Sequence, residues 1–291
     1  MNIIEINHLK KYYGKHRGVE DVTFQVKEGE IFGFIGPNGS GKSTTIRCAL
    51  SLIYPTSGNI KIFGLDSIKE RVEIAKNVGY LPGEVFYYDN MTVKDLLNYS
   101  ASFYQNSDKK VRLDLCEALE LDQSKKIEDL SLGNKKKVGI VQGLLHNPKL
   151  IILDEPTSGL DPLMQQRFFQ LIEERRRQGA TILFSSHILS EVKRLSDRIA
   201  IIRNGMIQDI NTVMKLESNA YKNILVQASE DQLLKLDQLP HLEARTTEIG
   251  RRDYTYRGDM NTLLQELSQA HVSNLTIEDP SLEEIFMHYY E

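Results

Sequence analysis

Two hydrophobic patterns alternate along this chain. Short runs that are apolar almost throughout are typical of strands buried on both faces of a sheet, whereas apolar residues three or four positions apart are typical of helices. The first pattern, together with shorter alternating segments, predicts strands at 3–6, 22–27, 31–35, 59–63, 78–81, 150–153 and 180–184. The second predicts helices at 42–52, 67–76 and 162–178. Strands that alternate with helices in this way indicate an α/β fold with a parallel sheet.

The segment at about 85–147 departs from this alternation because its pattern is only helical. Thr92 and Asp95 have the spacing of a capping box and open a helix with apolar residues at helical intervals. Asp108 is placed to cap a second helix, and a third is predicted over 135–146. We therefore expect an α-helical insert within the α/β fold.

A second, smaller domain is expected from about residue 211. Its patterns predict strands at 223–228, 242–249, 253–257 and 272–277, and helices at 230–236 and 259–270. The order βαββαβ is that of a ferredoxin-like split βαβ fold. Ser281 and Glu284 have capping-box spacing and predict a final helix, which either docks on its own domain or contacts a partner. The expected domains are 1–210 and 211–291.

The composition is that of an ordinary globular protein, with 41% hydrophobic and 26% charged residues. No apolar run approaches the roughly 18 residues of a membrane span, and the N-terminus lacks the features of a signal peptide. The net charge of −4 gives no general attraction to nucleic acid. Cys48 and Cys116 lie on separate predicted helices without metal-like spacing, so we expect reduced thiols in a cytoplasmic protein.

The most specific motif lies between the strand at 31–35 and the helix that follows it. It matches the phosphate-loop pattern and consists of Gly36, Pro37, Asn38, Gly39, Ser40, Gly41, Lys42, Ser43 and Thr44. Glycines allow successive backbone N–H groups to point at phosphate oxygens, and the helix N-terminus adds further donors. Lys42 is expected to reach the β- and γ-phosphates, Ser43 to bind Mg²⁺ and Thr44 to reach the α-phosphate. The motif predicts that the chain binds a nucleoside triphosphate.

Two carboxylates follow the apolar run at 150–153, at the end of a strand where open α/β sheets bind ligands. Asp154 suits a water-mediated contact to Mg²⁺, and Glu155 is placed to accept a hydrogen bond from the attacking water. His187 follows the strand at 180–184, at the same edge of the sheet, and is a candidate contact of the γ-phosphate. The alternatives are an exposed pair of carboxylates and a structural histidine.

Two other segments each allow a structural and a functional interpretation. Tyr13 lies upstream of the phosphate loop, where an aromatic ring is placed to stack on adenine, but it also suits a surface turn. Residues 130–134, with sequence Leu-Ser-Leu-Gly-Asn, precede three lysines and an apolar helix. That segment alone is equally typical of a capped helix start followed by solvated lysines.

In their order and spacing, these motifs resemble the nucleotide-binding domain of ATP-binding cassette (ABC) transporters over about the first 210 residues. The matching segments are the phosphate loop, 130–134 at the position of the family signature, 150–155, 158–161 and His187. The resemblance implies a P-loop NTPase fold with a RecA-like core, an antiparallel β subdomain and an α-helical subdomain. The C-terminal segment would add a small α+β domain.

The resemblance also implies how the site is completed. Such domains form head-to-tail homodimers that sandwich ATP, so Ser131 and Gly133 of one subunit would touch the γ-phosphate held by the other. Tyr13 would stack on the adenine, and Asp161 would link the two sites across the dimer. Glu155 would act as the general base or polarise the attacking water, while His187 would clamp the γ-phosphate.

Two positions depart from the family pattern. The family usually has glutamine after a Leu-Pro pair in the coupling loop, where this chain has Gly83, so Glu84 or water would have to serve as the Mg²⁺ ligand. The signature has Leu132 and Asn134 where glycine and glutamine are usual. Ser131 and Gly133 are retained, so the changes bear on the rate of hydrolysis and its coupling.

The function implied is that of an ATPase subunit that powers export through a separate polytopic membrane permease. The C-terminal domain resembles those of bacterial multidrug, antibiotic-resistance or lipid exporters. Such a subunit would be peripheral on the cytoplasmic face of the cell membrane and would bind no nucleic acid. One alternative is a soluble cassette ATPase that acts on ribosomes or nucleic acid, which the acidic net charge disfavours. Another is a regulatory module that binds ATP and hydrolyses it slowly, which Gly83 and Leu132 favour.

Overall fold

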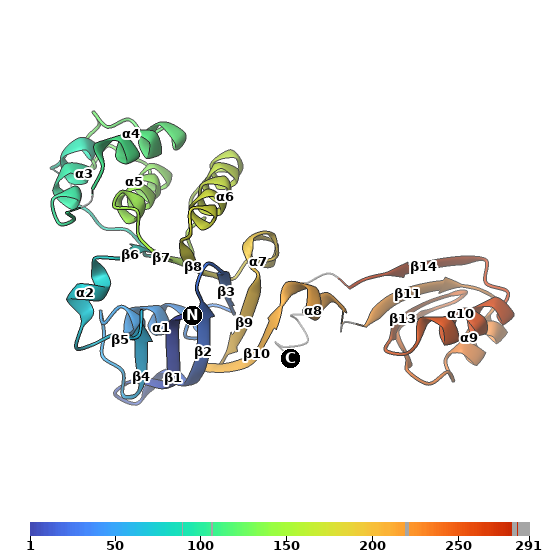
Figure 1. Ribbon diagram of the computed structural model, residues 1–291. Helices are drawn as coiled ribbons and strands as arrows, with labels where there is room; N and C mark the ends of the chain where they lie inside the picture. Colours follow the sequence, from blue (N-terminus) through green and yellow to red (C-terminus); the bar gives the residue numbers. More distant parts are fainter. Residues whose placement is uncertain (89, 106, 219–220, 281–283, 285–291) are drawn as a thin grey trace. The chain divides into compact units, whose positions relative to one another are not determined.

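The computed structural model describes residues 1–88, 90–105, 107–218, 221–280 and 284. The chain divides into two compact units, Met1–Thr212 and Val213–Glu291, each described by itself below (Figure 1). Every helix in the described part of the chain is too short or too polar to cross a lipid bilayer.

The sheet of the N-terminal unit has a parallel and an antiparallel half. The parallel half contains, in spatial order, β6 (Val78–Leu81), β7 (Leu150–Asp154), β8 (Thr181–Ser186), β3 (Ile31–Ile35) and β9 (Arg198–Arg203). The other half contains β10 (Met206–Thr212), β2 (His16–Lys27), β1 (Asn2–Tyr13), β4 (Ser57–Ile62) and β5 (Leu65–Asp66). Its pairs are antiparallel except for a short parallel contact between β10 and β2. The predicted apolar runs are β3, β7 and β8, in which every residue is buried.

The helices of this unit are α1 (Lys42–Ala49), α2 (Arg71–Ala75), α3 (Val93–Ala101), α4 (Lys109–Ala118), α5 (Leu132–Leu144), α6 (Pro162–Arg177) and α7 (Leu189–Leu195). Helices α3 to α5 form the insert that the sequence predicts (Figure 1). Side-chain caps define where they begin: Thr92 accepts a hydrogen bond from the Asp95 N–H, and Asp108 accepts one from the Lys110 N–H. Each cap satisfies a backbone donor that the helix itself leaves free.

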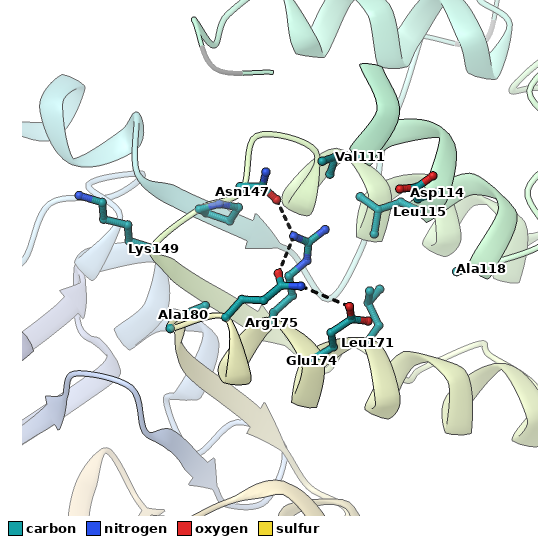
Figure 2. Close-up of a pocket in the computed structure, with 13 residues that line it drawn as sticks. Val111, Asp114, Leu115, Ala118, Asn147, Lys149, Leu171, Glu174, Arg175 and Ala180 are labelled. Atoms are coloured by element: carbon teal, nitrogen blue, oxygen red, sulfur yellow. Dashed lines mark hydrogen bonds between the residues drawn. The ribbon is translucent and has the colours of Figure 1, made fainter. Parts of the chain in front are cut away.

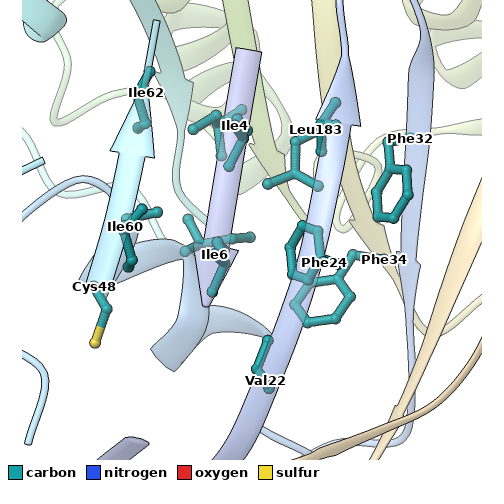
Figure 3. Packing of buried hydrophobic residues seen from close by; sticks show 14 of the residues in the cluster. Ile4, Ile6, Val22, Phe24, Phe32, Phe34, Cys48, Ile60, Ile62 and Leu183 are labelled. Atoms are coloured by element: carbon teal, nitrogen blue, oxygen red, sulfur yellow. The ribbon is translucent and has the colours of Figure 1, made fainter. Parts of the chain in front are cut away.

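A cluster of buried apolar side chains joins the two halves of the sheet to α1 (Figure 3). Ile4, Phe24 and Ile62 contribute from the antiparallel half, and the Phe24 ring stacks on Phe32 of β3 with the centroids 5.2 Å apart. Ile46 of α1 packs into the same cluster. This packing fixes the start of α1, and with it the phosphate loop, against the end of β3.

One predicted helix and two predicted strands differ in length from the observed elements, and one observed helix was not predicted. The helix expected at 67–76 is limited to Arg71–Ala75, because Asp66 accepts hydrogen bonds from the backbone N–H groups of Ile68 and Lys69 and holds a turn there. The strands expected at 3–6 and 22–27 are parts of the longer β1 and β2, which form one hairpin. Helix α7 was not expected from the sequence pattern.

The C-terminal unit has a four-stranded sheet in the order β12-β13-β11-β14, with all neighbouring strands antiparallel. Its elements are α8 (Val213–Ser218), β11 (Lys222–Gln227), α9 (Glu230–Leu236), β12 (Leu242–Glu248), β13 (Arg251–Tyr256), α10 (Met260–Gln269) and β14 (Asn274–Glu278). From β11 onward the order is βαββαβ, the split βαβ arrangement. Leu233 of α9 and Leu263 of α10 pack on Ile224 and Tyr254 of the sheet. The final helix predicted from Ser281 lies outside the described residues, apart from Glu284.

Candidate nucleotide site

The loop between β3 and α1 has the conformation that a phosphate-binding loop requires. Gly39 and Gly41 have φ angles of 77° and 110°, in the left-handed region that favours glycine. The exposed residues at its tip are Pro37, Asn38 and Gly39, whereas Gly36 and Ser40 are buried. Ser43 and Thr44 lie in the first turn of α1 and are partly exposed. The N-terminus of α1 therefore opens onto this loop, as an anion site needs.

Lys42 is the first residue of α1, and its side chain turns back into the loop. Only 4% of it is exposed, and Nζ donates to the carbonyl oxygens of Gly36 at 2.7 Å and Pro37 at 3.2 Å. Burial lowers the pKa of Lys42, and the nearby Glu155 and Asp154 carboxylates partly oppose that effect. The ammonium therefore already lies among oxygen acceptors within the loop.

Asp154 ends β7 and is almost completely buried. One of its oxygens, Oδ1, accepts a hydrogen bond from Ser185 Oγ on the adjacent β8 at 2.7 Å. Oδ2 faces Gly83, where a Cβ atom would lie 4.0 Å away. The charge of this buried carboxylate favours cations at the end of β7, and the ammonium groups of Lys42 and Lys136 already interact with it.

Glu155 brings three predicted site residues together. Its backbone N–H donates to the Ser185 carbonyl oxygen at 3.1 Å, and its φ of 47° is unusual for a residue with a side chain. Its Oε1 atom lies 3.6 Å from Lys42 Nζ and 3.3 Å from His187 Nδ1. The carboxylate thus links the phosphate loop to the residue that follows β8.

His187 is half exposed and lies on a loop that a buried network holds. Ser186 Oγ donates to the Glu191 carboxylate at 2.8 Å and accepts a hydrogen bond from the Ile188 N–H at 2.9 Å. Glu191 is only 6% exposed. Its signal in the sequence is a carboxylate on the otherwise apolar face of α7, which the sequence analysis did not single out.

Tyr13 ends β1 beside the phosphate loop. A Cβ atom on Gly18 would lie 2.8 Å from Cε2 of the Tyr13 ring and 3.1 Å from Cγ2 of Thr44. Lys11 Nζ lies 5.1 Å from the centroid of the ring, and 46% of Tyr13 is exposed. The ring is therefore next to the start of α1, with a surface open to a ligand.

The segment 130–134 lies at the N-terminus of α5, on the surface. Ser131 caps the helix by accepting a hydrogen bond from the backbone N–H three residues later, and 67% of Leu132 is exposed. A Cβ atom on Gly133 would lie 2.7 Å from the carbonyl oxygen of Gly159. Asp161, two residues further along that loop, is exposed and caps α6. The two loops thus touch within one chain and present an exposed edge.

Known proteins with similar sequences place the chain in a family. A family model described as ABC transporter matches residues 19–158. The bacitracin transport ATP-binding protein BcrA of Bacillus licheniformis is 34% identical over 98% of this chain and 96% of the relative. The chain belongs to the ATP-binding proteins of ABC transporters. The linearmycin resistance ATP-binding protein LnrL of Bacillus subtilis (strain 168) is 31% identical over 98% of this chain and 97% of the relative.

The solved structure of an ATP-binding subunit of an ABC transporter shares the fold of this ABC ATPase. It is 32% identical, has a TM-score of 0.69, and is matched over 74% of this chain and 92% of its own. The predictions of the ABC family, the P-loop NTPase fold and ATPase activity are therefore confirmed. Binding of ATP, the nucleotide of the family, follows with them.

The coupling loop of this ABC ATPase is the segment 82–88 that follows β6. It contains Gly83 and Glu84, the two positions that the sequence analysis considered for a Mg²⁺ ligand. The backbone of Gly83 is next to Asp154, whereas Glu84 is exposed at the following position. The oxygen donors that best fit Mg²⁺ are the Asp154 carboxylate and the Ser43 hydroxyl, because Mg²⁺ favours one or two protein oxygens together with phosphate and water. Among the described residues, there is no cluster of three or more histidine, cysteine or acidic side chains that could hold a metal ion by itself.

The lysine run at 135–137, for which solvated side chains were one of two interpretations from the sequence, contains a buried residue. Lys136 is 2% exposed, and its Nζ donates to the carbonyl oxygens of Pro82 at 3.0 Å and Gly83 at 2.9 Å. Burial lowers its pKa to about 8, although the charges of Asp154 and Glu155 oppose that effect. The sequence does contain an indication that Lys136 is buried, because it lies four residues before Ile140 and so shares the buried face of α5.

A separate cavity of about 680 Å³ lies between α4 and α6 (Figure 2). Arg175 spans it by donating to Asn147 and Gln178, and the aliphatic side chains of Val111 and Leu115 line the opposite wall. None of the residues predicted to bind nucleotide lines this cavity.

Proposed function

We propose that hydrolysis of ATP takes place where Lys42, Glu155 and His187 converge. The contact of Glu155 Oε1 with both Lys42 Nζ and His187 Nδ1 supports this most directly. Lys42 would exchange its backbone acceptors for the β- and γ-phosphates, and His187 would contact the γ-phosphate. Glu155 would orient the attacking water and accept its proton, and the fixed charges around it would stabilise the transition state. Ser43 and Asp154 would hold Mg²⁺, which supplies charge neutralisation on the phosphates when bound.

The proposal extends to the base of ATP and to a second subunit. The half-exposed ring of Tyr13 would stack on the adenine, since it borders the start of α1. In a homodimer, Ser131 and Gly133 would meet the ATP held by the partner subunit, and Asp161 would lie between the two sites. The exposed position of Ser131 and Asp161 on adjoining loops supports this arrangement.

We further propose that this ABC ATPase powers export of an antibiotic or another drug, a peptide or a lipid through a separate polytopic permease, and an antibiotic is the best supported of these. The names of the two relatives, a bacitracin transport protein and a linearmycin resistance protein, support this substrate class. An exposed aromatic pair, Tyr99 on α3 and Phe103 just after it, supports contact with such a partner, because the rings lie 5.0 Å apart at the surface. The protein would then lie on the cytoplasmic face of the cell membrane.

The test is to purify the Glu155→Gln variant, with ATP present, from detergent-solubilised cells that naturally produce the protein. The variant should hold ATP without turning it over and keep its assembly intact. A polytopic membrane protein in stoichiometric amount is the expected result. Recovery of ribosomes or nucleic acid without a membrane protein would reject the transporter proposal in favour of a soluble cassette ATPase. A parallel purification of Lys42→Met, which should hold ATP poorly, shows which partners depend on the nucleotide.

A further inference from the structure

The buried ammonium of Lys136 has an unusual environment for a lysine within a run of three. Lys135 and Lys137, its neighbours on α5, are partly exposed, whereas Lys136 is 2% exposed. Its two described hydrogen bonds go to consecutive backbone carbonyl oxygens, those of Pro82 and Gly83. Burying a charge costs free energy, and an apolar residue in such a place is often as stable or more so. The stability of the fold therefore gives no sufficient reason for a lysine here.

The coupling loop lies directly on the backbone of α5. A Cβ atom on Gly139 would be 2.8 Å from both Leu81 Cδ1 and the Tyr87 hydroxyl, and that hydroxyl donates to the carbonyl oxygen of Lys135 at 3.2 Å. Deeper in the unit, a Cβ atom on Gly79 would be 2.1 Å from the carbonyl oxygen of Gly143. Helix α5 thus meets β6 backbone to backbone at Gly79 and Gly143, and the side chains of Leu81 and Tyr87 fill the space over Gly139. Lys136 lies at the end of this contact that is nearest to Asp154.

Helix α5 and the coupling loop that packs on it reach two different parts of the site. The N-terminal turn of α5 is the exposed segment 130–134, which touches the loop at Gly159. In the coupling loop, a Cβ atom on Gly83 would lie 3.6 Å from the carbonyl oxygen and 4.0 Å from Oδ2 of Asp154. Gly83 has no side chain with which to fix this distance. Its carbonyl group accepts a hydrogen bond from Lys136, which ties this backbone to α5.

We propose that Lys136 is a positioning residue for ATP hydrolysis: it fastens the backbone at residues 82 and 83 to α5, so that the signature turn and the backbone beside Asp154 move together. A displacement of the signature turn is then passed to the Asp154 side of the site through two hydrogen bonds. The inference rests on the proposed roles of Asp154 and Glu155, but not on the transported compound.

The absence of tryptophan from the chain allows a direct test. A full-length reference protein with Phe86→Trp carries a single tryptophan in the coupling loop, at a position that is 85% exposed. Lys136→Met, which keeps an unbranched side chain one atom shorter but removes its donors, is compared with Lys137→Met on the same background. Acrylamide quenching and fluorescence anisotropy of the tryptophan are measured without nucleotide and with ATP and Mg²⁺, alongside kcat and KM for ATP.

The expected result is a difference between two adjacent lysines. Lys136→Met should lower kcat roughly tenfold or more while KM changes less than about twofold, because a displaced catalytic element weakens reaction more than binding. Its tryptophan should be more mobile without nucleotide and should lose its response to ATP. Lys137→Met should match the reference protein in both respects. A lower melting temperature of Lys136→Met, with kcat and fluorescence like those of Lys137→Met, would overturn the proposal and leave only a stabilising role.

Two further outcomes are distinguished by the same design. If Lys136→Met does not fold, Lys136→Gln, which retains one amide donor group, takes its place. An intermediate kcat and an intermediate ATP response then support the proposal, whereas values equal to the reference reject it. If the reference protein itself binds ATP without hydrolysing it, the assignment of the catalytic residues fails, and the nucleotide-free anisotropy still decides whether Lys136 holds the loop.

Discussion

On each side of β7, a buried lysine donates hydrogen bonds to two consecutive backbone carbonyl oxygens, but the two lysines differ in what else they can contact. On the phosphate-loop side, Lys42 is 4% exposed and donates to two consecutive carbonyl oxygens just after β3. On the insert side, Lys136 is 2% exposed and donates to two consecutive carbonyl oxygens just after β6. Burial lowers the pKa of both lysines. Each therefore ties a helix to the loop that follows a parallel strand.

The difference lies in what else each ammonium can reach. Lys42 lies 3.6 Å from Glu155 at the mouth of a loop built for phosphate, so a nucleotide offers it better acceptors than backbone carbonyls. Lys136 is enclosed between α5 and the coupling loop, which the glycine contacts keep closely packed. We expect a lysine of the first kind to change partners during the reaction and one of the second kind to keep them. Substitutions on the two sides should thus separate binding from positioning.

The largest effect is expected from Glu155→Gln, between the two sides. Loss of the proposed general base should lower turnover roughly a hundredfold or more, as is typical for proton transfer. Affinity for ATP should be retained, because the amide has nearly the same shape and still accepts a hydrogen bond. Steady-state ATPase rates and ATP binding are measured together, with Glu174→Gln, at an exposed position of α6, as the control. Wild-type turnover in Glu155→Gln would remove this residue from the mechanism.

Lys42→Met should act on binding instead. A hydrogen bond to a charged group contributes about 1.5–3 kcal/mol, so ATP affinity should fall roughly tenfold to a hundredfold. Titration calorimetry with ATP measures this for Lys42→Met and for Lys136→Met in parallel. Affinity should change little in the second variant. Equal losses of affinity in the two variants would contradict the distinction between a lysine that binds and one that positions.

The phosphate-loop side was largely predictable from the sequence, and the insert side was not. Consecutive apolar residues can only be buried on both faces, which locates β3 and β7, and the glycine pattern then determines the loop between β3 and α1. Strand ends of a parallel sheet share one edge, so the contact between Glu155 and His187 follows from the same pattern.

Lys136 illustrates what the pattern cannot give. Three consecutive lysines suggest a solvated surface, since charged side chains are rarely buried. Which of the three turns inward depends on how α5 is rotated against β6, and contacts at Gly139 and Gly143 determine that rotation. Such contacts join residues far apart in the chain. The proposed roles of Tyr13 and Ser131 remain predictions for another reason, because they concern a bound nucleotide and a second subunit.

A smaller effect is expected from Gly83→Gln, which gives the insert side the amide that the family pattern usually has there. A Cβ atom at this position makes ordinary van der Waals contact with Asp154, so the fold should tolerate the change. The added oxygen beside Asp154 should lower the Mg²⁺ concentration needed for half-maximal ATPase activity, by roughly tenfold or less. Gly83→Ala separates the amide from the mere filling of space. An unchanged Mg²⁺ requirement in Gly83→Gln would show that Asp154 does not depend on this loop for metal binding.

The smallest effect concerns the far end of α5, where the insert side buries a histidine. His146 is 5% exposed, stacks on Tyr104 with the centroids 3.7 Å apart, and lies 3.2 Å from the Val78 carbonyl oxygen through Nε2. Burial lowers its pKa to about 4, and its Nδ1 atom has no partner in the described structure. The unfolded histidine, with a pKa of about 6.5, therefore takes up a proton more readily than the folded one. Its stabilising contribution is present above pH ~6.5 and is lost as the pH falls towards 4.

His146→Phe keeps a ring to stack on Tyr104 but removes this titration. Between pH 7 and pH 5, the free energy of unfolding should therefore decrease less in the variant than in the wild type, by about 1–2 kcal/mol. Urea unfolding followed by circular dichroism at the two pH values measures the difference, with His16→Phe as the control at an exposed histidine. The same decrease in His146→Phe and in the wild type would mean that His146 takes up its proton as readily in the folded protein as in the unfolded chain. The insert side would then accommodate a buried positive charge near both ends of α5, at Lys136 and at His146.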